Sequence, residues 1–204
     1  MTAHISDDGQ GREESVAEHT EIVTLLCKEK GKRCGLSQVM ALCGILHDMG
    51  KNKQKFNDYI HADEKAKRKL RGSIAHASTG AKYIYDMHHG NSGNTKCMVE
   101  MASYAVAAHH GLFDCVDVKY KDIFSAKLEK VDDYEEACSN ARQDYLGGYE
   151  LDKVFSEASE EYALVWDKMK GVVTRLQPLL RSGYKEKARE KLSECRNFLL
   201  GCLQ

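Results

Sequence analysis

The feature that most restricts the fold is the near-absence of proline, since the 204 residues contain only Pro178. Proline interrupts helices, so a chain almost free of it can form long helical segments. Aromatic residues make up only 8% of the chain, and the frequent Ala, Leu, Glu and Lys favour helices. A chain of this length with 42% hydrophobic residues can bury one core. The sequence therefore predicts a single all-α domain.

Apolar residues at helical spacing divide the chain into a series of predicted helices. Ser15 and Glu18 match a capping box that starts the first helix, and Gly31 ends it. The run QVMALCGILHDMG, residues 38–50, is apolar on nearly every side and predicts a central helix. The stretch from Asp114 to about Tyr149 has a poor pattern, and we expect it to be rich in loops. Further helices are predicted around 56–60 and at 64–71, 74–87, 96–110, about 151–180 and 184–203.

Polar residues stand at the ends of the two most apolar helices. His47-Asp48 follows the run ALCGIL, and His109-His110 follows ASYAVAA. Such groups are costly to bury unless something satisfies them. We therefore expect both pairs to converge in a pocket at the helix ends.

Two more histidines lie one turn inside predicted helices, His19 in the first and His76 in a helix of small residues. Taken singly, each is typical of a histidine satisfied in a core or a helix cap, and an adjacent His-Asp pair is common by chance. Together, four helices offer imidazole near a terminus and one adds a carboxylate. Imidazole favours Zn, Mn, Fe, Co or Ni, and a carboxylate can bridge two ions. The pattern indicates a site for one or two divalent metals.

A second pair of adjacent histidines, His88 and His89, has a different setting. It runs into GNSGN, a polar and glycine-rich segment typical of an exposed loop. We interpret this pair as solvated, with at most a contact to substrate, and His109 and His110 as the functional pair.

Charge is unevenly distributed although the net charge is −1. From Lys51 to Gly72 there are 8 basic and 3 acidic residues, and from Glu129 to Glu161 there are 3 basic and 11 acidic residues. Such stretches are commonly solvated helix faces, but the first leaves room for a polyanion. The eight cysteines include no CxxC pair, so the usual zinc spacing is missing. With no apolar segment for secretion or a membrane, we expect a soluble, cytoplasmic protein.

These motifs resemble a known family. LHDMGK resembles the signature of the HD superfamily of metal-dependent phosphohydrolases. The chain is most similar to one branch, the HD nuclease domain of the type I CRISPR interference helicase–nuclease. The matching strings are AHISDDG, VAEHT, LHDMGKNKQKFNDYI, IAHASTGA and VAAHHGL, in the family's order, from about Ala3 to Phe113. The resemblance implies an all-α HD-domain helical bundle over residues 1–204, with its metal site at converging helix ends.

The resemblance also implies roles for individual residues. Asp48 would bridge two ions, Lys51 would approach a DNA phosphate or steady the site, and Ser78 would hydrogen-bond near the scissile group. His4 matches a family position to which we assign no role. The implied metal ligands are His19, His47, Asp48, His76, His109 and His110, for one or two divalent ions of Mn, Ni, Fe, Co or Mg. The candidates for substrate binding are Lys51, Lys53, Lys55, Lys67 and Arg68.

The implied reaction is metal-dependent hydrolysis of single-stranded DNA in type I CRISPR interference, an antiviral defence, by endonuclease or exonuclease cleavage. The implied partners are single-stranded DNA, the helicase portion of the same or a partner chain, and the CRISPR RNA-guided surveillance complex. Two alternatives remain open. One is an HD phosphohydrolase that acts on nucleotides or cyclic nucleotides, and the other is a non-catalytic helical adaptor that binds a CRISPR complex.

The sequence departs from the family pattern in one respect. The family usually closes its site with an aspartate on a helix shortly after the segment that matches FLLGC, residues 198–202, but this sequence stops at Gln204. It also contains no GxxxxGK[ST] phosphate loop. We therefore expect a domain excised from a larger helicase–nuclease and truncated at its C-terminus. Asp114 and Asp117 are candidates for the missing ligand, although each is more typical of an ordinary loop aspartate.

Overall fold

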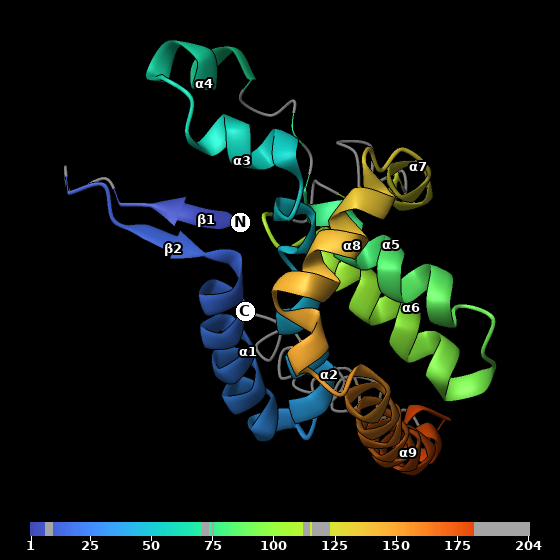
Figure 1. Cartoon of the computed structure of the whole chain (residues 1–204). Coiled ribbons are helices and arrows are strands. Elements are labelled where there is room, and N and C mark those ends of the chain that lie inside the picture. The colour runs from blue at the N-terminus through green and yellow to red at the C-terminus, as the bar shows by residue number, and fades with distance from the viewer. Residues whose placement is uncertain (7–9, 71–73, 75, 112–114, 116–122, 182–204) are drawn as a thin grey trace.

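Helices account for most of the regular structure in the computed structural model, which describes residues 1–6, 10–70, 74, 76–111, 115 and 123–181, with side chains up to residue 177 (Figure 1). The prediction of an all-α fold is confirmed, with one small two-stranded sheet added. The elements are β1 (Thr2–Ile5), β2 (Glu13–Ser15), α1 (Val16–Gly31), η1 (Lys32–Cys34), α2 (Ser37–Leu46), η2 (Met49–Lys51), α3 (Gln54–Ile60), α4 (Glu64–Leu70), α5 (Ala77–His88), α6 (Gly93–Ala107), α7 (Phe124–Glu129), α8 (Tyr134–Asp144), η4 (Leu146–Gly148) and α9 (Leu151–Arg181), where η marks a 3₁₀ helix.

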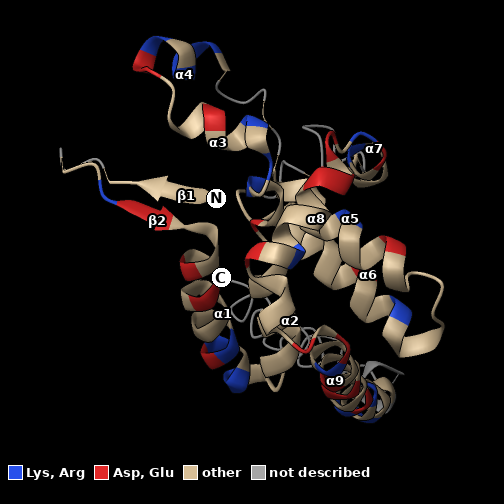
Figure 2. Ribbon diagram, viewed as in Figure 1, with Lys and Arg blue, Asp and Glu red and all other residues tan. Residues whose placement is uncertain are grey.

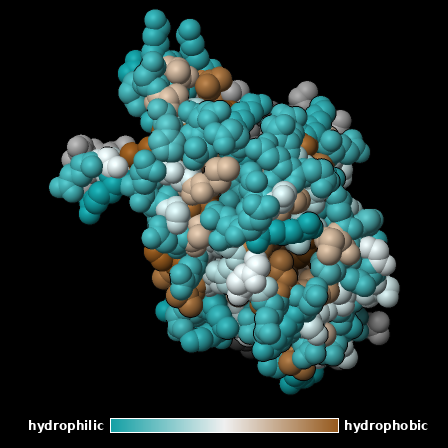
Figure 3. Space-filling model, in the orientation of Figure 1, coloured by the Kyte–Doolittle hydropathy of each residue, from teal (hydrophilic) through white to brown (hydrophobic). Residues whose placement is uncertain are grey.

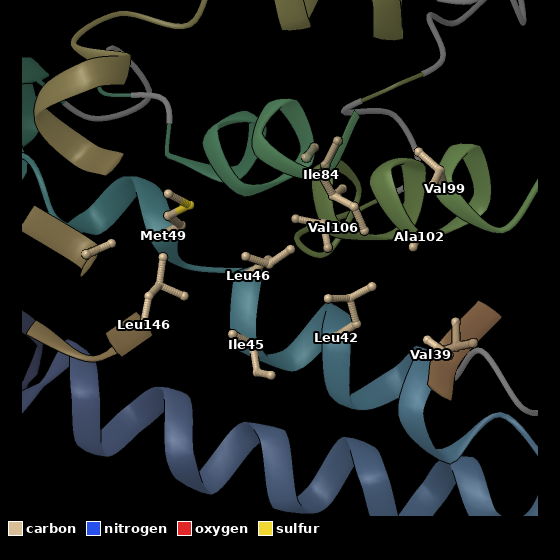
Figure 4. Close-up of a cluster of buried hydrophobic side chains, with 14 of the residues drawn as sticks. Val39, Leu42, Ile45, Leu46, Met49, Ile84, Val99, Ala102, Val106 and Leu146 are labelled. Atoms are coloured by element: carbon tan, nitrogen blue, oxygen red, sulfur yellow. The ribbon is translucent and has the colours of Figure 1, made fainter. Parts of the chain in front are cut away.

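The central helix is α2, as its apolar composition predicts. It packs against α1, α6 and α9, so it has neighbours on several sides. Figure 4 shows its side chains in the core with those of α5, α6 and η4. The labelled residues are Val39, Leu42, Ile45, Leu46, Met49, Ile84, Val99, Ala102, Val106 and Leu146. Burial of these side chains holds the C-terminal end of α2 in a fixed position among the other helices.

Two glycines allow backbones to approach α2 closely. A Cβ at Gly80 of α5 would lie 1.9 Å from the carbonyl oxygen of Leu46, the last residue of α2. A Cβ at Gly44 would lie 2.8 Å from the Cα of Thr24 in α1. Only residues without a Cβ fit at these crossings. The two glycines therefore bring α1 and α5 against the end of α2.

The sequence analysis did not predict the N-terminal hairpin. β1 and β2 pair antiparallel, with His4 opposite Glu14. β2 leads directly into α1, whose predicted capping box is confirmed, because the Ser15 hydroxyl accepts from the Glu18 amide and the Glu18 carboxylate accepts from the Ser15 amide. The hairpin is thus attached to the start of the helix that carries His19.

Other boundaries differ from the predicted ones. The stretch predicted to be loop-rich contains α7 and α8. The buried face of α8 consists of the small residues Ala137, Cys138 and Ala141, which produce a weak apolar pattern. The central helix ends at Leu46 and continues through a turn into η2, whereas we predicted that it would reach Gly50. The predicted helix at 184–203 lies outside the described residues.

Some apolar side chains of α1 remain on the surface. Ile22, Leu25 and Leu26 are each more than half exposed, and Figure 3 shows brown side chains over α1 on a largely hydrophilic face. None of the described helices has both the length and the apolar composition that spanning a membrane requires.

Candidate metal centre

The centre of the site is Asp48, which follows α2 and is 2% exposed. Its Oδ2 atom lies 3.1 Å from Nε2 of His47 and 3.3 Å from Nε2 of His19. Its Oδ1 atom lies 3.6 Å from Nε2 of His76 and 3.5 Å from Nε2 of His109. Residues that are far apart in the sequence therefore place four imidazoles around one carboxylate.

His110 joins the cluster through His76, whose Nε2 atom lies 2.7 Å from Nε2 of His110. The structure thus brings together all six residues that the resemblance implied as metal ligands. They form two groups whose ligand atoms lie within 4.8 Å of one another, and Asp48 belongs to both. One group adds His19 and His47 to it, and the other adds His76, His109 and His110. A carboxylate shared by two donor groups can bridge a pair of ions.

Backbone carbonyls fix the proton position on two of the rings. Nδ1 of His47 donates to the Gly44 carbonyl at 2.8 Å, and Nδ1 of His109 donates to the Val106 carbonyl at 2.8 Å. Both histidines stand just beyond a helix, where the last carbonyls have no partner within the helix. In the neutral ring the other nitrogen, Nε2, then presents its lone pair toward Asp48.

The residues present fit a divalent cation. Nε2 of His109 and Oδ1 of Asp48 are both buried and lack a hydrogen-bond partner, although they lie 3.5 Å apart. A lone pair and a carboxylate oxygen repel each other unless a proton or a cation lies between them. A set of imidazoles with one carboxylate is also a usual donor set for divalent transition metals.

The charge states of Asp48 and His76 suit metal binding as well. Burial raises the pKa of the Asp48 carboxyl, but the surrounding imidazoles, His109 first among them, lower it more, so it lies well below its usual range. Burial lowers the pKa of His76 to about 4. The hydrogen bond to Asp48 raises the pKa of His19. At neutral pH the carboxylate is therefore charged and His76 is neutral, and both are ready to act as ligands.

Lys51 lies inside the protein. It is 4% exposed, and its Nζ atom lies 2.8 Å from Oδ2 of Asp48. The same atom contacts Nε2 of His4 at 3.1 Å and the Ala3 carbonyl at 3.4 Å. This position suits the steadying role, because an ammonium held by three internal partners does not reach an external phosphate.

Lys53, which we predicted to bind substrate, is also buried. It is 2% exposed, and burial lowers the pKa of its ammonium. As with Lys51, the sequence offered no sign of this burial, because lysine is almost always found at the surface. Both ammonium groups therefore lie inside the protein in this structure, and their predicted contacts with substrate stay predictions.

The remaining predicted residues lie outside the cluster. Lys55 is exposed and lies 4.0 Å from Asp132. Lys67 and Arg68 lie on α4, which extends beyond α3 (Figure 1) and contains several basic residues, blue in Figure 2. Ser78 is half-buried in the first turn of α5, two residues after His76. Their predicted roles remain predictions.

His88 and His89 occupy positions other than the predicted loop. α5 continues through His88, whose ring stacks on Phe155 of α9 with centroids 3.6 Å apart, so His88 is half-buried rather than solvated. His89 is exposed and stacks on Tyr85. The pair is not part of the donor groups around Asp48, which include His109 and His110.

A cleft of about 700 Å³ reaches the cluster at His47 and His109. It lies between α1, α2 and α6. Its walls are mostly apolar and include Val23, Cys27, Met40, Cys43, Met101 and Tyr104.

The sequence reasoning missed the part that the hairpin plays beside the cluster. His4 on β1 lies with its ring centroid 4.6 Å from that of His19, and Glu14 on β2 contacts the same ring. A usable signal was present in the turn-forming run DDGQG between two short segments, which is typical of a hairpin. Asp114 and Asp117 lie outside the described residues.

A helical domain with five histidines around a buried aspartate at helix ends has the donor set of a metal-binding protein. The chain matches the family described as "Cas3, HD domain" over residues 11–188, and it belongs to that family. It is therefore an HD nuclease domain of Cas3 type, a divalent-metal-dependent nuclease of type I CRISPR systems. No curated protein and no solved structure matches the chain significantly.

Proposed function

We propose that this domain cuts single-stranded DNA during CRISPR interference in the cytoplasm. One observation carries the proposal, the cluster of five imidazoles that includes the buried carboxylate of Asp48. The proposed ligands of one or two divalent ions are His19, His47, Asp48, His76, His109 and His110. An imidazole-rich set favours Mn, Fe, Co or Ni over Mg, which prefers oxygen ligands.

The bound ions would supply Lewis-acid stabilisation of charge on the phosphate and would lower the pKa of water. The protein's own residues prepare the site for this. Lys51 holds the Asp48 carboxylate from one side at 2.8 Å, and the carbonyls of Gly44 and Val106 orient His47 and His109. Because Asp48 is the one carboxylate in the set and is paired with an ammonium, the loaded site carries a net positive charge that attracts a phosphodiester.

A flexible single strand fits this recessed position better than a duplex does. The apolar cleft beside His47 and His109 offers surface for bases, and Tyr104 in its wall can stack with one. The cations Lys55, Lys67 and Arg68 are the proposed contacts to phosphates farther along the strand. The proposed protein partners are the helicase portion of the same or another chain and the RNA-guided surveillance complex.

The first experiment measures cleavage of circular single-stranded DNA by the purified chain with Mn²⁺, Ni²⁺, Mg²⁺ or chelator. We expect metal-dependent linearisation and degradation that Asp48→Ala abolishes. Asp86→Ala is the matched control, because Asp86 is exposed on α5 and forms an ion pair with Lys82 at 2.6 Å. Cleavage that persists in Asp48→Ala, or the absence of cleavage with every metal, would contradict the proposal.

A second experiment separates a nuclease from a hydrolase of small nucleotides. Neutralising four cations of α4 together should reduce cleavage of long DNA by at least tenfold and leave hydrolysis of bis-p-nitrophenyl phosphate unchanged. The four are Lys65, Lys67, Arg68 and Lys69. Equal rates on long DNA for the variant and the wild type would favour the small-substrate alternative.

A further inference from the structure

The imidazole of His19 connects the hairpin to the metal centre. Its Nε2 atom lies 3.3 Å from Oδ2 of Asp48 and 3.3 Å from Nε2 of His47. Its Nδ1 atom lies 3.2 Å from Oε2 of Glu14 on β2. One side of the ring therefore faces the proposed ligands, and the other faces a carboxylate.

His19 needs this carboxylate because of its place in a helix. His47 and His109 stand beyond helix C-terminal ends, where free carbonyls accept their Nδ1 protons. His19 is the fourth residue of α1, and the first turn of a helix has free N–H groups but no free carbonyl. An acceptor for its Nδ1 proton must come from another element, and Glu14 of β2 supplies it.

The strand geometry directs Glu14 to this task. Side chains alternate along a strand, so Glu13 and Glu14 point to opposite faces. The Glu13 carboxylate accepts from the Thr2 hydroxyl at 2.8 Å and lies 3.2 Å from Nε2 of His61. Glu14 instead faces the metal centre, and its partner in the strand register is His4, which contacts Lys51.

The three donors His4, Glu14 and His19 could in principle hold an ion of their own, since their ligand atoms lie within 4.8 Å of one another. Two contacts oppose this. Nε2 of His4 lies 3.1 Å from the ammonium of Lys51, which repels a cation. Nδ1 of His19 would also have to give up the proton that it shares with Glu14. The geometry therefore favours an orienting role over a separate ion site.

We propose that Glu14 is a positioning residue that holds His19 with its proton on Nδ1 and its Nε2 lone pair toward Asp48. The inference rests on the proposed ligation of a metal by His19. A carboxylate that accepts from the second nitrogen of a metal-bound histidine fixes the ring and raises its basicity, and its loss costs about tenfold to a hundredfold in metal affinity.

The test measures Mn²⁺ binding to the full chain by calorimetry and by the electron paramagnetic resonance of free Mn²⁺. We expect Glu14→Ala to raise the Kd of one bound ion by about tenfold to a hundredfold, with the number of bound ions unchanged. Glu14→Gln should show a smaller loss, because its amide oxygen still accepts the Nδ1 proton without the charge. The matched control is Glu13→Ala on the same strand, with a Kd within about twofold of the wild type.

Three results would overturn the inference. They are an unchanged Kd in Glu14→Ala, an equal rise in Kd for Glu13→Ala, and the loss of one bound ion, which would make Glu14 a ligand. Asp48→Ala identifies the failure of the proposed function separately. If the wild type binds no Mn²⁺, or if Asp48→Ala binds it as tightly, the metal centre itself is refuted, and the role of Glu14 with it.

Discussion

Replacing Gly80 by alanine tests whether the close approach of α5 to α2 builds the metal centre. A Cβ at Gly80 would lie 1.9 Å from the carbonyl oxygen of Leu46, whereas ordinary contact begins at 3.4 Å, so the backbones would separate by about 1.5 Å. Leu46 directly precedes His47, and His76 lies four residues before Gly80. The separation would therefore pull apart donors that now surround one carboxylate.

The expected change in the free energy of unfolding follows from two opposing effects. Overpacking of this kind costs about 1–3 kcal/mol or more, and alanine is better than glycine inside a helix by about 1 kcal/mol. We expect Gly80→Ala to lower the free energy of unfolding by about 2 kcal/mol, at the upper end of the range that these two effects allow, because neither the new Cβ nor the Leu46 carbonyl can rotate away. Metal ligands tolerate displacements of only about 0.2 Å, so Mn²⁺ affinity should fall by about tenfold or more.

Urea unfolding in the presence of chelator measures the loss of stability, and Mn²⁺ titration measures the loss of metal affinity. The matched control is Gly171→Ala in α9, where a Cβ would meet only the flexible side chain of Arg175 at 3.7 Å. This control should stabilise the protein by about 0.5–1 kcal/mol and leave Mn²⁺ binding unchanged. A Gly80→Ala protein with wild-type stability and wild-type affinity would refute the argument that this crossing positions the donors.

Three further predictions concern charge and metal. Lys51→Met breaks the buried ion pair with Asp48 and should lower the free energy of unfolding by about 3–5 kcal/mol, measured with urea and chelator. Lys55→Met, which removes an exposed pair with Asp132, should lower it by about 0.5 kcal/mol or less. Similar losses in the two variants would contradict this prediction. Mn²⁺ at 100 times its Kd should stabilise the wild type by about 2.7 kcal/mol, seen as a higher Tm, and should leave the Tm of Asp48→Ala unchanged. Burial lowers the pKa of His88 from 6.5, so the unfolded chain takes up this proton at a higher pH than the folded protein does. The free energy of unfolding therefore falls as the pH drops below about 6.5, until the pH passes the folded pKa. His88→Gln should reduce this fall, and an identical pH dependence of stability in both proteins would exclude the effect.

The sequence by itself determined the features that depend on neighbouring residues. Helical periodicity predicted α1, the central α2 and α9, because an amphipathic or buried helix repeats its apolar residues every three or four positions. The capping box at Ser15 was predictable because both of its hydrogen bonds lie within four consecutive residues. The His and Asp strings indicated a metal site and the family, since both the residue types and their order could be read directly.

Only the tertiary structure decided how these residues meet. Glu14 and His4 are common residues in a short strand, and their contacts with His19 and Lys51 depend on the pairing of β1 with β2. Burial of Lys53 and the stacking of His88 on α9 likewise depend on which helices pack together. The contact of His4 with Lys51, for example, joins residues 47 positions apart, and no local pattern specifies it. Metal affinity is set at this level, because it depends on distances of a few tenths of an ångström between donors on separate helices.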